Sequence, residues 1–240
     1  MELKHIYNHI AQDFSNTRQK IRPEFKIILN EIAISPKRQL FIADIWCGDG
    51  RLFDFLKKHL ENKQIYYTGL DFSSQLINIA KKRFSDANWI EDDMTNLYKH
   101  FPPLSQDIII FLASFHHIRS QRQRLSILKQ AYQILNYGGK VILINRNLRN
   151  SRYYKLLLKN ILINFFTLRR NDINWVYVPW KKKERVFQRY YHIFHTKELR
   201  ELLRSAGFEH LKQFFVDSKG KITTKRRGSR NLISIATKSI

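Results

Sequence analysis

Short apolar runs alternate with segments of helical period through the middle of the chain. The apolar runs are LFIADIW (40–46), IYYTGLDF (65–72), WIEDD (89–93), DIIIFLA (107–113) and KVILINR (140–146). Between them, hydrophobic residues recur every three or four positions, as at Leu52, Phe55 and Leu56, which is typical of the buried stripe of a helix. Several runs are apolar throughout, as in parallel strands covered on both faces. The alternation predicts a doubly wound α/β sheet.

The flanks of this core add helices and two more strands. Residues 3–33 are expected to be mostly helical, with an interruption near Pro23, and TKELRELLRSAGF (196–208) predicts a further helix. Segments 209–216 and 231–237 read as strands, and Gly138-Gly139 is expected to supply the turn before the strand at 140. The pattern predicts a mostly parallel sheet of seven strands, with helices on both faces.

Composition adds a strong positive charge. The chain has 43 Lys and Arg against 20 Asp and Glu, a formal charge of +23, which predicts a polyanionic partner. The alternative is that biased base composition of the genome enriched lysine. We find no apolar run of spanning length, signal peptide or amphipathic anchor, so no membrane partner is expected. The single cysteine, Cys47, excludes an internal disulfide and a cysteine-based zinc cluster. A soluble, cytoplasmic protein without a metal site is the simplest expectation.

Candidate chemistry lies at the predicted strand ends. In an open α/β sheet, ligands bind beyond the carboxyl ends of the strands, where the strand order reverses. Asp44, Gly48 and Gly50 follow the first strand, Asp71 ends the second and Asp93 the third, and SFHH (114–117) follows the fourth. Glycines let the backbone approach a ligand, and an acid about twenty positions later can accept hydrogen bonds from ribose hydroxyls. The patterns of dinucleotide dehydrogenases and of P-loop enzymes are both absent from the sequence.

These motifs resemble those of class I S-adenosylmethionine-dependent methyltransferases. IADIWCGDG resembles that family's acid-x-Gly-x-Gly-x-Gly turn, GLDFSSQLINIA its second strand and helix, and EDDMTNL its adenine-binding turn. The resemblance implies a Rossmann-like fold with S-adenosylmethionine as cofactor, Asp71 on the ribose, Asp93 on the adenine amino group and Met94 against the adenine ring. Gly48 and Gly50 would line the path of the methionine moiety.

Trp46 departs from this pattern, because it stands where the family's first glycine would be. The indole would either point away from the ligand or form part of its wall. We expect a remodelled but active site, with the indole over the methionine chain or the sulfonium. The alternative is a cofactor site that no longer works.

The flanking segments resemble, in the same order, the tRNA wobble-uridine carboxymethyl methyltransferases. They are IYNHIAQDFSNTRQK (6–20), FHHIRSQRQRL (115–125), VPW (178–180), RYYHIF (189–194) and RGSRNLISI (227–235), and they span nearly the whole chain. The resemblance implies that the enzyme esterifies the carboxymethyl group of a wobble uridine in tRNA. Relatives in that family often work with a small zinc-binding activator subunit, which makes such a partner a further prediction.

The resemblance and the strand ends together give the candidate residues. The cofactor-binding set is Tyr7, Arg18, Asp44, Trp46, Gly48, Gly50, Asp71, Asp93 and Met94. The catalytic candidates are His117, Arg189 and His192, and the substrate-binding candidates are Arg146, Trp180 and Tyr191. A carboxylate is already ionised at neutral pH, so the site needs alignment and cationic or hydrogen-bonding side chains rather than a strong base. Each candidate has a structural alternative, such as a core histidine, a solvated strand end or a core tryptophan.

The chain is expected to be a single domain over 1–240. Its parts are an N-terminal helical segment (1–37), a cofactor-binding core (38–146), a basic insertion (147–188) and a C-terminal helix with strands (189–240). Basic clusters at 146–155, 168–170, 181–185 and 219–230 suggest a track for an RNA backbone. Two other functions stay open: a small-molecule O- or C-methyltransferase resembling quinone-biosynthesis enzymes, and a noncatalytic RNA-binding protein on a methyltransferase scaffold.

Overall fold

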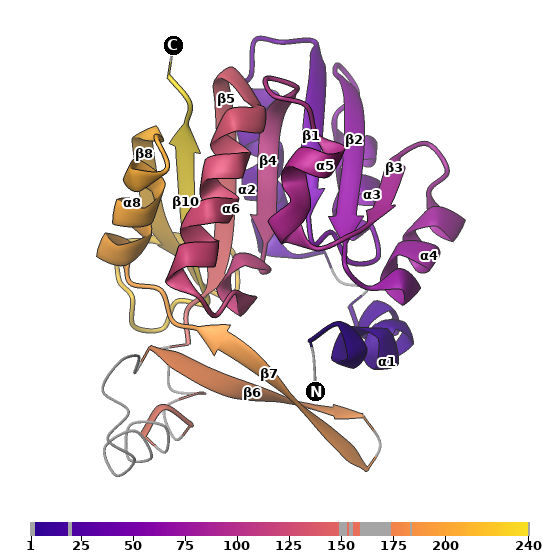
Figure 1. Ribbon diagram of the computed structural model, residues 1–240, viewed down its shortest axis with the longest axis vertical. Coiled ribbons are helices and arrows are strands. Elements are labelled where there is room, and N and C mark those ends of the chain that lie inside the picture. Colours follow the sequence, from indigo (N-terminus) through magenta and orange to yellow (C-terminus); the bar gives the residue numbers. More distant parts are fainter. Residues whose placement is uncertain are drawn as a thin grey trace.

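The protein is built around one large mixed sheet (Figure 1). The computed structural model describes residues 3–18, 21–148, 153, 156–158, 174–182 and 184–239. In the order of the sheet, the strands are β3 (Asn88–Glu91), β2 (Gln64–Asp71), β1 (Gln39–Ile45), β4 (Gln106–Leu112), β5 (Leu135–Arg146), β10 (Asn231–Thr237), β8 (Glu209–Val216) and β9 (Ile222–Thr223). The seven predicted strands are confirmed, and the two-residue β9 makes the sheet eight-stranded.

The strand order reverses between β1 and β4. The chain runs from β1 outward to β2 and β3, then returns to the other side of β1 as β4 and β5, and all of these neighbours pair in parallel. Strands β10, β8 and β9 continue the sheet in antiparallel pairing. The carboxyl ends of β1 and β4 therefore lie side by side at a topological switch point, where this class of sheet binds its ligands.

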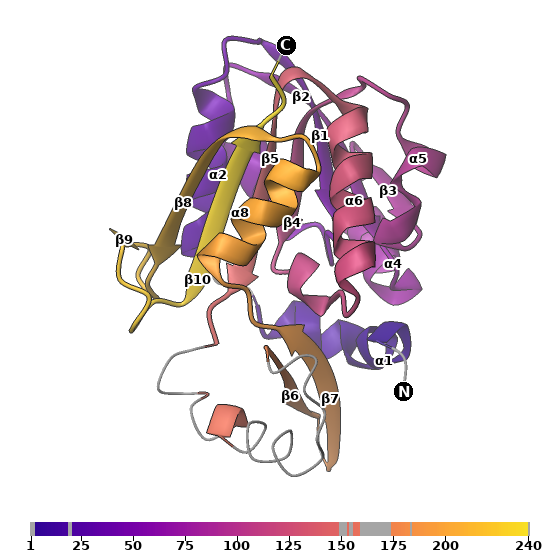
Figure 2. The same cartoon turned by 60° about the vertical axis from the view of Figure 1, so that its left-hand side comes forward.

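Helices cover both faces of the sheet (Figure 2). Helices α2 (Pro23–Ala33), α3 (Arg51–His59) and α4 (Ser74–Arg83) bury their apolar residues against one face. Helices α5 (Leu97–His100), α6 (Gln121–Ile134) and α8 (Thr196–Ser205) cover the other. The fixed backbone angle of proline suits the first turn of a helix, which explains why Pro23 begins α2. No helix among the described residues is long and apolar enough to cross a membrane.

The carboxyl end of the sheet carries two additional elements. Helix α1 (Leu3–Asn16) packs there against α4, and a two-stranded hairpin of β6 (Trp175–Lys182) and β7 (Arg185–His192) projects from the same end (Figure 1). Short 3₁₀ turns at Met94–Asn96 and Phe115–His117 follow β3 and β4. The predicted boundary between a basic insertion and a C-terminal part, at 188/189, falls inside β7 and is wrong as a structural division.

The predicted turn at Gly138-Gly139 is also misplaced. Helix α6 ends at Ile134, and β5 already begins at Leu135. Gly138 lies within that strand with φ 75°, where the register against β4 shifts. The two glycines therefore accommodate a bulge in the strand instead of ending the helix. Of the predicted basic clusters, 149–152, 154–155 and 168–170 lie outside the described residues.

Candidate active site

A cavity opens at the switch point, between the carboxyl ends of β1 and β4. Its volume is about 60 Å³, well below the 300–1,000 Å³ common for ligand sites. The residues around it are Tyr7, Phe14, Arg18, Arg22, Asp44, Trp46, Cys47, Gly48, Arg51, Asp71, Phe72, Leu76, Leu112, Ala113, Ser114, His117, Arg146, Arg189 and Tyr191. Tyr7 and Phe14 of α1 are among them, so the side chains of this helix narrow the cavity.

The loop after β1 has the backbone of a glycine turn, including at its tryptophan. Trp46 has φ 61° and Gly48 φ 64°, so the tryptophan takes the left-handed conformation that the missing glycine would adopt freely. Ala113, after β4, has φ 58°. Strained backbone of this kind tends to persist at functional sites, and here two strained non-glycine residues line one cavity.

The glycines of the loop have different roles. A Cβ on Gly48 would lie 3.4 Å from the ring of Phe14, whereas one on Gly50 would lie 2.7 Å from the ring of Trp89. Gly50 has φ 79° and is the N-cap residue of α3, and it is absent from the lining of the cavity. The assignment of Gly50 to the methionine path is therefore corrected: its missing side chain makes room for Trp89 in the core.

Two buried aspartates face the cavity. Asp71 accepts hydrogen bonds from the N–H groups of Gly48 (2.9 Å) and Ser73 (2.8 Å). Asp44 accepts one from the hydroxyl of Tyr67 through Oδ2, while its buried Oδ1 has no hydrogen-bond partner among the described residues. Burial raises the pKa of each carboxyl group to about 7, against the lowering effect of these hydrogen bonds. Both groups therefore titrate near neutral pH and respond to a cation placed beside them.

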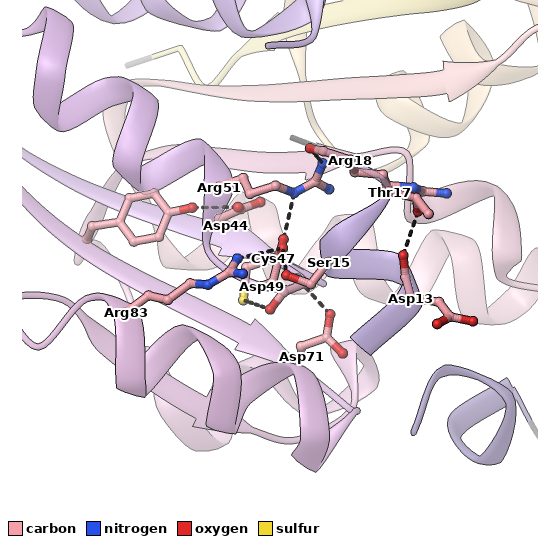
Figure 3. Close-up of polar contacts among 12 residues, drawn as sticks. Asp13, Ser15, Thr17, Arg18, Asp44, Cys47, Asp49, Arg51, Asp71 and Arg83 are labelled. Atoms are coloured by element: carbon pink, nitrogen blue, oxygen red, sulfur yellow. Dashed lines mark hydrogen bonds and ion pairs between the residues drawn. The ribbon is translucent and has the colours of Figure 1, made fainter. Parts of the chain in front are cut away.

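A buried aspartate fastens α1 over this loop (Figure 3). Asp49 accepts a hydrogen bond from the hydroxyl of Ser15 (2.7 Å) and pairs with Arg51 (2.6 Å) and Arg83 (3.2 Å). Arg51 also donates to the backbone carbonyl of Arg18 (2.7 Å). We call these contacts the α1 latch. Sequence reasoning missed the latch, although the acid between two glycines in CGDG was visible.

A second hollow of about 420 Å³ adjoins the cavity. It is lined by Leu3, Lys4, Trp46, Phe72, Glu91, Asp92 and Asp93. Trp46 and Phe72 line both spaces, and their rings lie 4.3 Å apart between centroids. Asp93 is thus placed beside the tryptophan wall. Met94 is fully buried in the core below it and lines neither space, so its assignment to the adenine ring is not supported by this geometry.

His117 is held in one neutral tautomer. Its Nδ1 lies 2.7 Å from the carbonyl oxygen of Tyr190, which can only accept, so Nδ1 carries the proton. Nε2 then accepts from the hydroxyl of Tyr7 at 3.3 Å. Burial lowers the pKa of His117 to about 3. The imidazole therefore does not supply a positive charge to the site.

Positive charge comes instead from arginines. Arg22 pairs with Glu24 (3.4 Å), but the described residues give no ion pair to Arg18, Arg146 or Arg189. Burial lowers the pKa of Arg18 to about 10, so the guanidinium stays charged. Burial also opposes the charge of Arg189, but Tyr191 and Tyr7 raise its pKa above the ordinary value.

Trp180 supports two of these arginines. The guanidinium carbons of Arg18 and Arg189 lie 5.1 and 4.9 Å from centroids of its indole. Phe14 stacks on the same indole at 6.2 Å between centroids. Trp180 is not among the residues that line the cavity. It therefore positions cationic groups, and its predicted role as a platform for a flipped base is not supported here.

His192 lies away from the cavity. Its Nε2 is 2.6 Å from Oε1 of Glu198 on α8, and its ring packs on Phe194 at 4.6 Å between centroids. The predicted catalytic role of His192 is therefore corrected: the side chain fixes the junction between β7 and α8. In the described part of the chain, no group of three or more His, Cys, Asp or Glu side chains could hold a metal ion.

Comparisons with known proteins agree with this arrangement. A family model described as a methyltransferase domain matches residues 43–141. A tRNA (carboxymethyluridine(34)-5-O)-methyltransferase of Schizosaccharomyces pombe is 27% identical over 222 residues, covering 84% of this chain and 86% of the relative. A ubiquinone/menaquinone biosynthesis C-methyltransferase of Campylobacter jejuni is 27% identical over 152 residues, covering 60% of this chain and 63% of the relative. Longer animal tRNA methyltransferases also match, and the chain spans at most 30% of their length.

Solved structures share the fold. An S-adenosylmethionine-dependent methyltransferase of Methanosarcina mazei has a TM-score of 0.67 at 19% identity, covering 88% of this chain and 97% of that chain. A chain from the complex of a Haloferax volcanii methyltransferase with a methyltransferase activator also has a TM-score of 0.67, at 16% identity, covering 100% of this chain and 98% of that chain. At these identities the likeness is one of fold.

The side chains around the two hollows fit S-adenosylmethionine. The unpartnered Oδ1 of Asp44 offers an acceptor to the ammonium group, Asp71 can accept from ribose hydroxyls, and Arg18 can pair with the carboxylate. Because the cavity is small, we expect α1 to shift before the ligand enters. The matched domain, the sheet order and this fit support a methyltransferase that uses S-adenosylmethionine, and the chain resembles the tRNA carboxymethyluridine methyltransferases.

Proposed function

We propose that this enzyme methylates the carboxylate of a carboxymethyl group on the wobble uridine of a tRNA. The Schizosaccharomyces pombe relative carries that activity in its name and matches along most of this chain. The proposal places the enzyme with its tRNA substrate in the cytoplasm. The charge balance of the cavity supports this acceptor over a neutral one.

The proposal depends mainly on an excess of arginines around the cavity, of which Arg189 is buried and Arg18 and Arg146 are half-buried. Arg18, Arg146 and Arg189 line the cavity without an ion pair among the described residues. The cofactor brings one carboxylate, which can satisfy one of them. A neutral quinone-like acceptor would leave the remaining guanidinium groups, among them that of the buried Arg189, against an uncharged ligand, which is costly. A carboxylate acceptor would pair with them.

The chain's own residues then have definite tasks. A carboxylate with pKa near ~4 is ionised at neutral pH, so the neutral His117 does not need to remove a proton. Arg189 and Arg146 would hold the acceptor carboxylate, and Tyr7 with Phe14 would exclude water. S-adenosylmethionine supplies the electrophilic methyl group when it is bound. Alignment of the carboxylate oxygen with that group is the main contribution that the protein makes.

Exposed basic residues at the same end of the sheet support an RNA substrate. The loop between β8 and β10 begins and ends where Val216 pairs with Asn231, next to Arg146 at the end of β5. Its exposed cations are Lys219, Lys221, Lys225 and Arg227. Cations placed near the cavity would attract the phosphates that flank a target nucleotide.

The activator subunit stays a prediction. The Haloferax volcanii neighbour was solved with a methyltransferase activator, and we propose that a small activator also binds this chain. Co-expression with a zinc-binding activator of the source organism should yield a stable complex. Methyl transfer by the isolated chain at the rate of the complex would remove the need for such a subunit.

The substrate can be tested directly. The purified enzyme should transfer methyl groups to tRNA that carries carboxymethyluridine, and nucleoside mass spectrometry should detect the methyl ester. Arg189→Ala should lower transfer about 10- to 150-fold, the range for a lost hydrogen bond to a charged group, while sparing cofactor affinity. The matched control is Arg185→Ala, because Arg185 is exposed on the same strand. Turnover of a demethylated quinone in place of tRNA would overturn the proposal.

A further inference from the structure

The β6–β7 hairpin presents two different faces. Successive side chains of a strand point to opposite sides, and the inward side carries Val178, Arg189 and Tyr191, which are buried against the protein. The outward side carries Tyr177 paired with Tyr190, and Pro179 paired with Gln188. Tyr177 is 38% exposed, and Pro179, Lys181 and Gln188 are exposed as well. The same two strands thus line the cavity on one side and reach solvent on the other at Tyr177, although Tyr190 is only 8% exposed and Trp175 is half-buried.

Aromatic rings and an arginine gather on the outward side. Tyr177 lies 5.3 Å from Trp175 and 6.2 Å from Tyr190 between ring centroids. Arg119, from the loop before α6, places its guanidinium carbon 5.2 Å from the ring centroid of Tyr190. It also donates to the hydroxyl of Tyr177 at 3.3 Å. We call Tyr177, Tyr190, Trp175 and Arg119 the outer aromatic face.

This composition suits unpaired nucleotides. Bases stack on exposed tyrosine rings and on guanidinium planes, and neighbouring cations attract the phosphates. Arg119 is exposed and has no acidic partner among the described residues, and Lys181 and Arg185 are exposed on the same hairpin. An apolar partner surface would gain less here, because each ring is bordered by a cationic or polar side chain.

The position of the face relates it to the cavity. Tyr190 lies beneath Tyr177 on the outward side with its ring 8% exposed, and its backbone carbonyl accepts a hydrogen bond from His117 Nδ1. Its neighbours Arg189 and Tyr191 line the cavity. A nucleotide in the cavity is therefore separated from the outer aromatic face by the thickness of one hairpin. Nucleotides adjoining the target can pass round the hairpin and reach these rings.

We propose that the outer aromatic face binds unpaired bases of the substrate RNA that neighbour the methylated nucleotide. The inference rests on the proposed function, since it assumes a target within a single-stranded loop. It assigns Tyr177 and Arg119 to RNA binding, separately from the arginines of the cavity. The hairpin then acts as a divider between the reacting nucleotide and its neighbours.

The test compares two substrates and uses a binding assay that does not depend on transfer. Binding of an anticodon stem–loop RNA is followed by fluorescence anisotropy, and methyl transfer is measured on that RNA and on free 5-carboxymethyluridine nucleoside. Tyr177→Ala should weaken RNA binding about 5- to 150-fold, the range for one lost stacked base. Arg119→Ala should weaken it as well, and turnover of the nucleoside and affinity for the cofactor should be unchanged in both.

Control variants distinguish loss of the outer aromatic face from the loss of any exposed tyrosine and from damage to the hairpin. Tyr177→Phe keeps the ring and should bind RNA like the wild type, and Tyr66→Ala removes a tyrosine that is 41% exposed on β2. Arg119 lies outside the hairpin, so Arg119→Ala tests the face even if Tyr177→Ala loosens the strands. Unchanged RNA binding in both alanine variants would overturn the inference. Wild-type protein that binds the RNA but methylates neither substrate would instead overturn the proposed function.

Discussion

At the scale of single residues, Trp46 is informative because it stands where related glycine turns have a glycine. Its left-handed backbone costs a non-glycine residue roughly 1–2 kcal/mol, and its half-buried indole packs on Phe72 at the wall shared by both hollows. A side chain kept in such a conformation at this wall is expected to contact the cofactor. The loop geometry around it is that of an intact glycine turn.

We predict that Trp46→Gly lowers affinity for S-adenosylmethionine about 2- to 30-fold, the range for a lost cation–π contact. The substitution relieves the strained φ of 61°, so the fold should survive. Isothermal titration calorimetry with both proteins provides the measurement. Tighter binding by the variant would show that the indole obstructs the site.

Asp44 gives a pH-dependent prediction. Its pKa of about 7 in the folded protein lies above the ordinary value of 3.8, so this group's contribution to stability is lost as pH rises through 7. The amide of Asp44→Asn does not ionise, so the variant avoids this pH-dependent loss of stability, and it can keep the hydrogen bond from Tyr67. The free energy of unfolding of the variant relative to wild type should be greater at pH 8 than at pH 5, by on the order of 2 kcal/mol.

Chemical denaturation at both pH values would measure this difference, and calorimetry should show weaker cofactor binding by the variant. Equal differences at pH 5 and pH 8 would mean that Asp44 is ionised throughout this range. If the predicted difference is found, Asp44 lowers stability at neutral pH, and its role is to bind the cofactor.

The sequence predicted the roles of residues that lie directly at the ends of strands. Asp44, Asp71 and Gly48 meet at one cavity because parallel strands bring their carboxyl ends together. Gly50 and His192 have other roles. Trp89, the partner of Gly50, is distant in sequence, and Glu198, the partner of His192, lies on the next helix, just outside the motif that suggested the histidine. Ser15, Asp49 and Arg51 form the α1 latch through a contact between segments, which no local pattern encodes.

At the scale of elements, α1 lines the cavity through Tyr7 and Phe14, and we expect this helix to control entry of the cofactor. The hydroxyl of Ser15 is one of the contacts that hold α1 to Asp49. We predict that Ser15→Ala speeds cofactor association several-fold and lowers the free energy of unfolding by about 1 kcal/mol. Asp49 keeps Arg51 and Arg83 as partners, which limits the loss of stability.

Stopped-flow tryptophan fluorescence would measure the association rate. Gln12→Ala is the matched control, because Gln12 lies on the exposed side of the same helix and its side chain donates a hydrogen bond to Asn16 of that helix. An unchanged rate in Ser15→Ala would mean that cofactor enters without release of the latch.

The β6–β7 hairpin shows the limit of pattern reasoning at this scale. The helices and sheet strands have strong periodicity, and they appear where the pattern predicts them. The hairpin strands carry Pro179 and a run of lysines, both of which weaken a strand pattern. Pairing with β7 and packing of Phe187 and Trp180 beside α1 override that local preference.

At the scale of the whole molecule, the charge of +23 is the dominant property. We predict that tRNA binding weakens steeply with salt, whereas cofactor binding does not. The triple variant Lys219→Ala, Lys221→Ala, Lys225→Ala should reduce the slope of log affinity against log salt by roughly 2–3. A variant of Arg38, Lys129 and Arg204, exposed residues toward the amino ends of the strands, provides the control of equal charge.

Filter binding over a salt series would measure both slopes. An equal reduction in the two triple variants would mean that the charge acts as a diffuse field. A larger reduction in the first would locate the RNA at the carboxyl end of the sheet.

The place of β10 also has a consequence for how the molecule is made. This strand, Asn231–Thr237, lies between β5 and β8 and bonds to both, and Asn231 donates to the buried Glu24 on α2. During synthesis on the ribosome, β5 and β8 therefore emerge before β10, and the edges that pair with β10 stay unpaired until it is made. Unpaired edges invite association with other chains, so nascent polypeptide that stalls before residue 231 should depend heavily on chaperones.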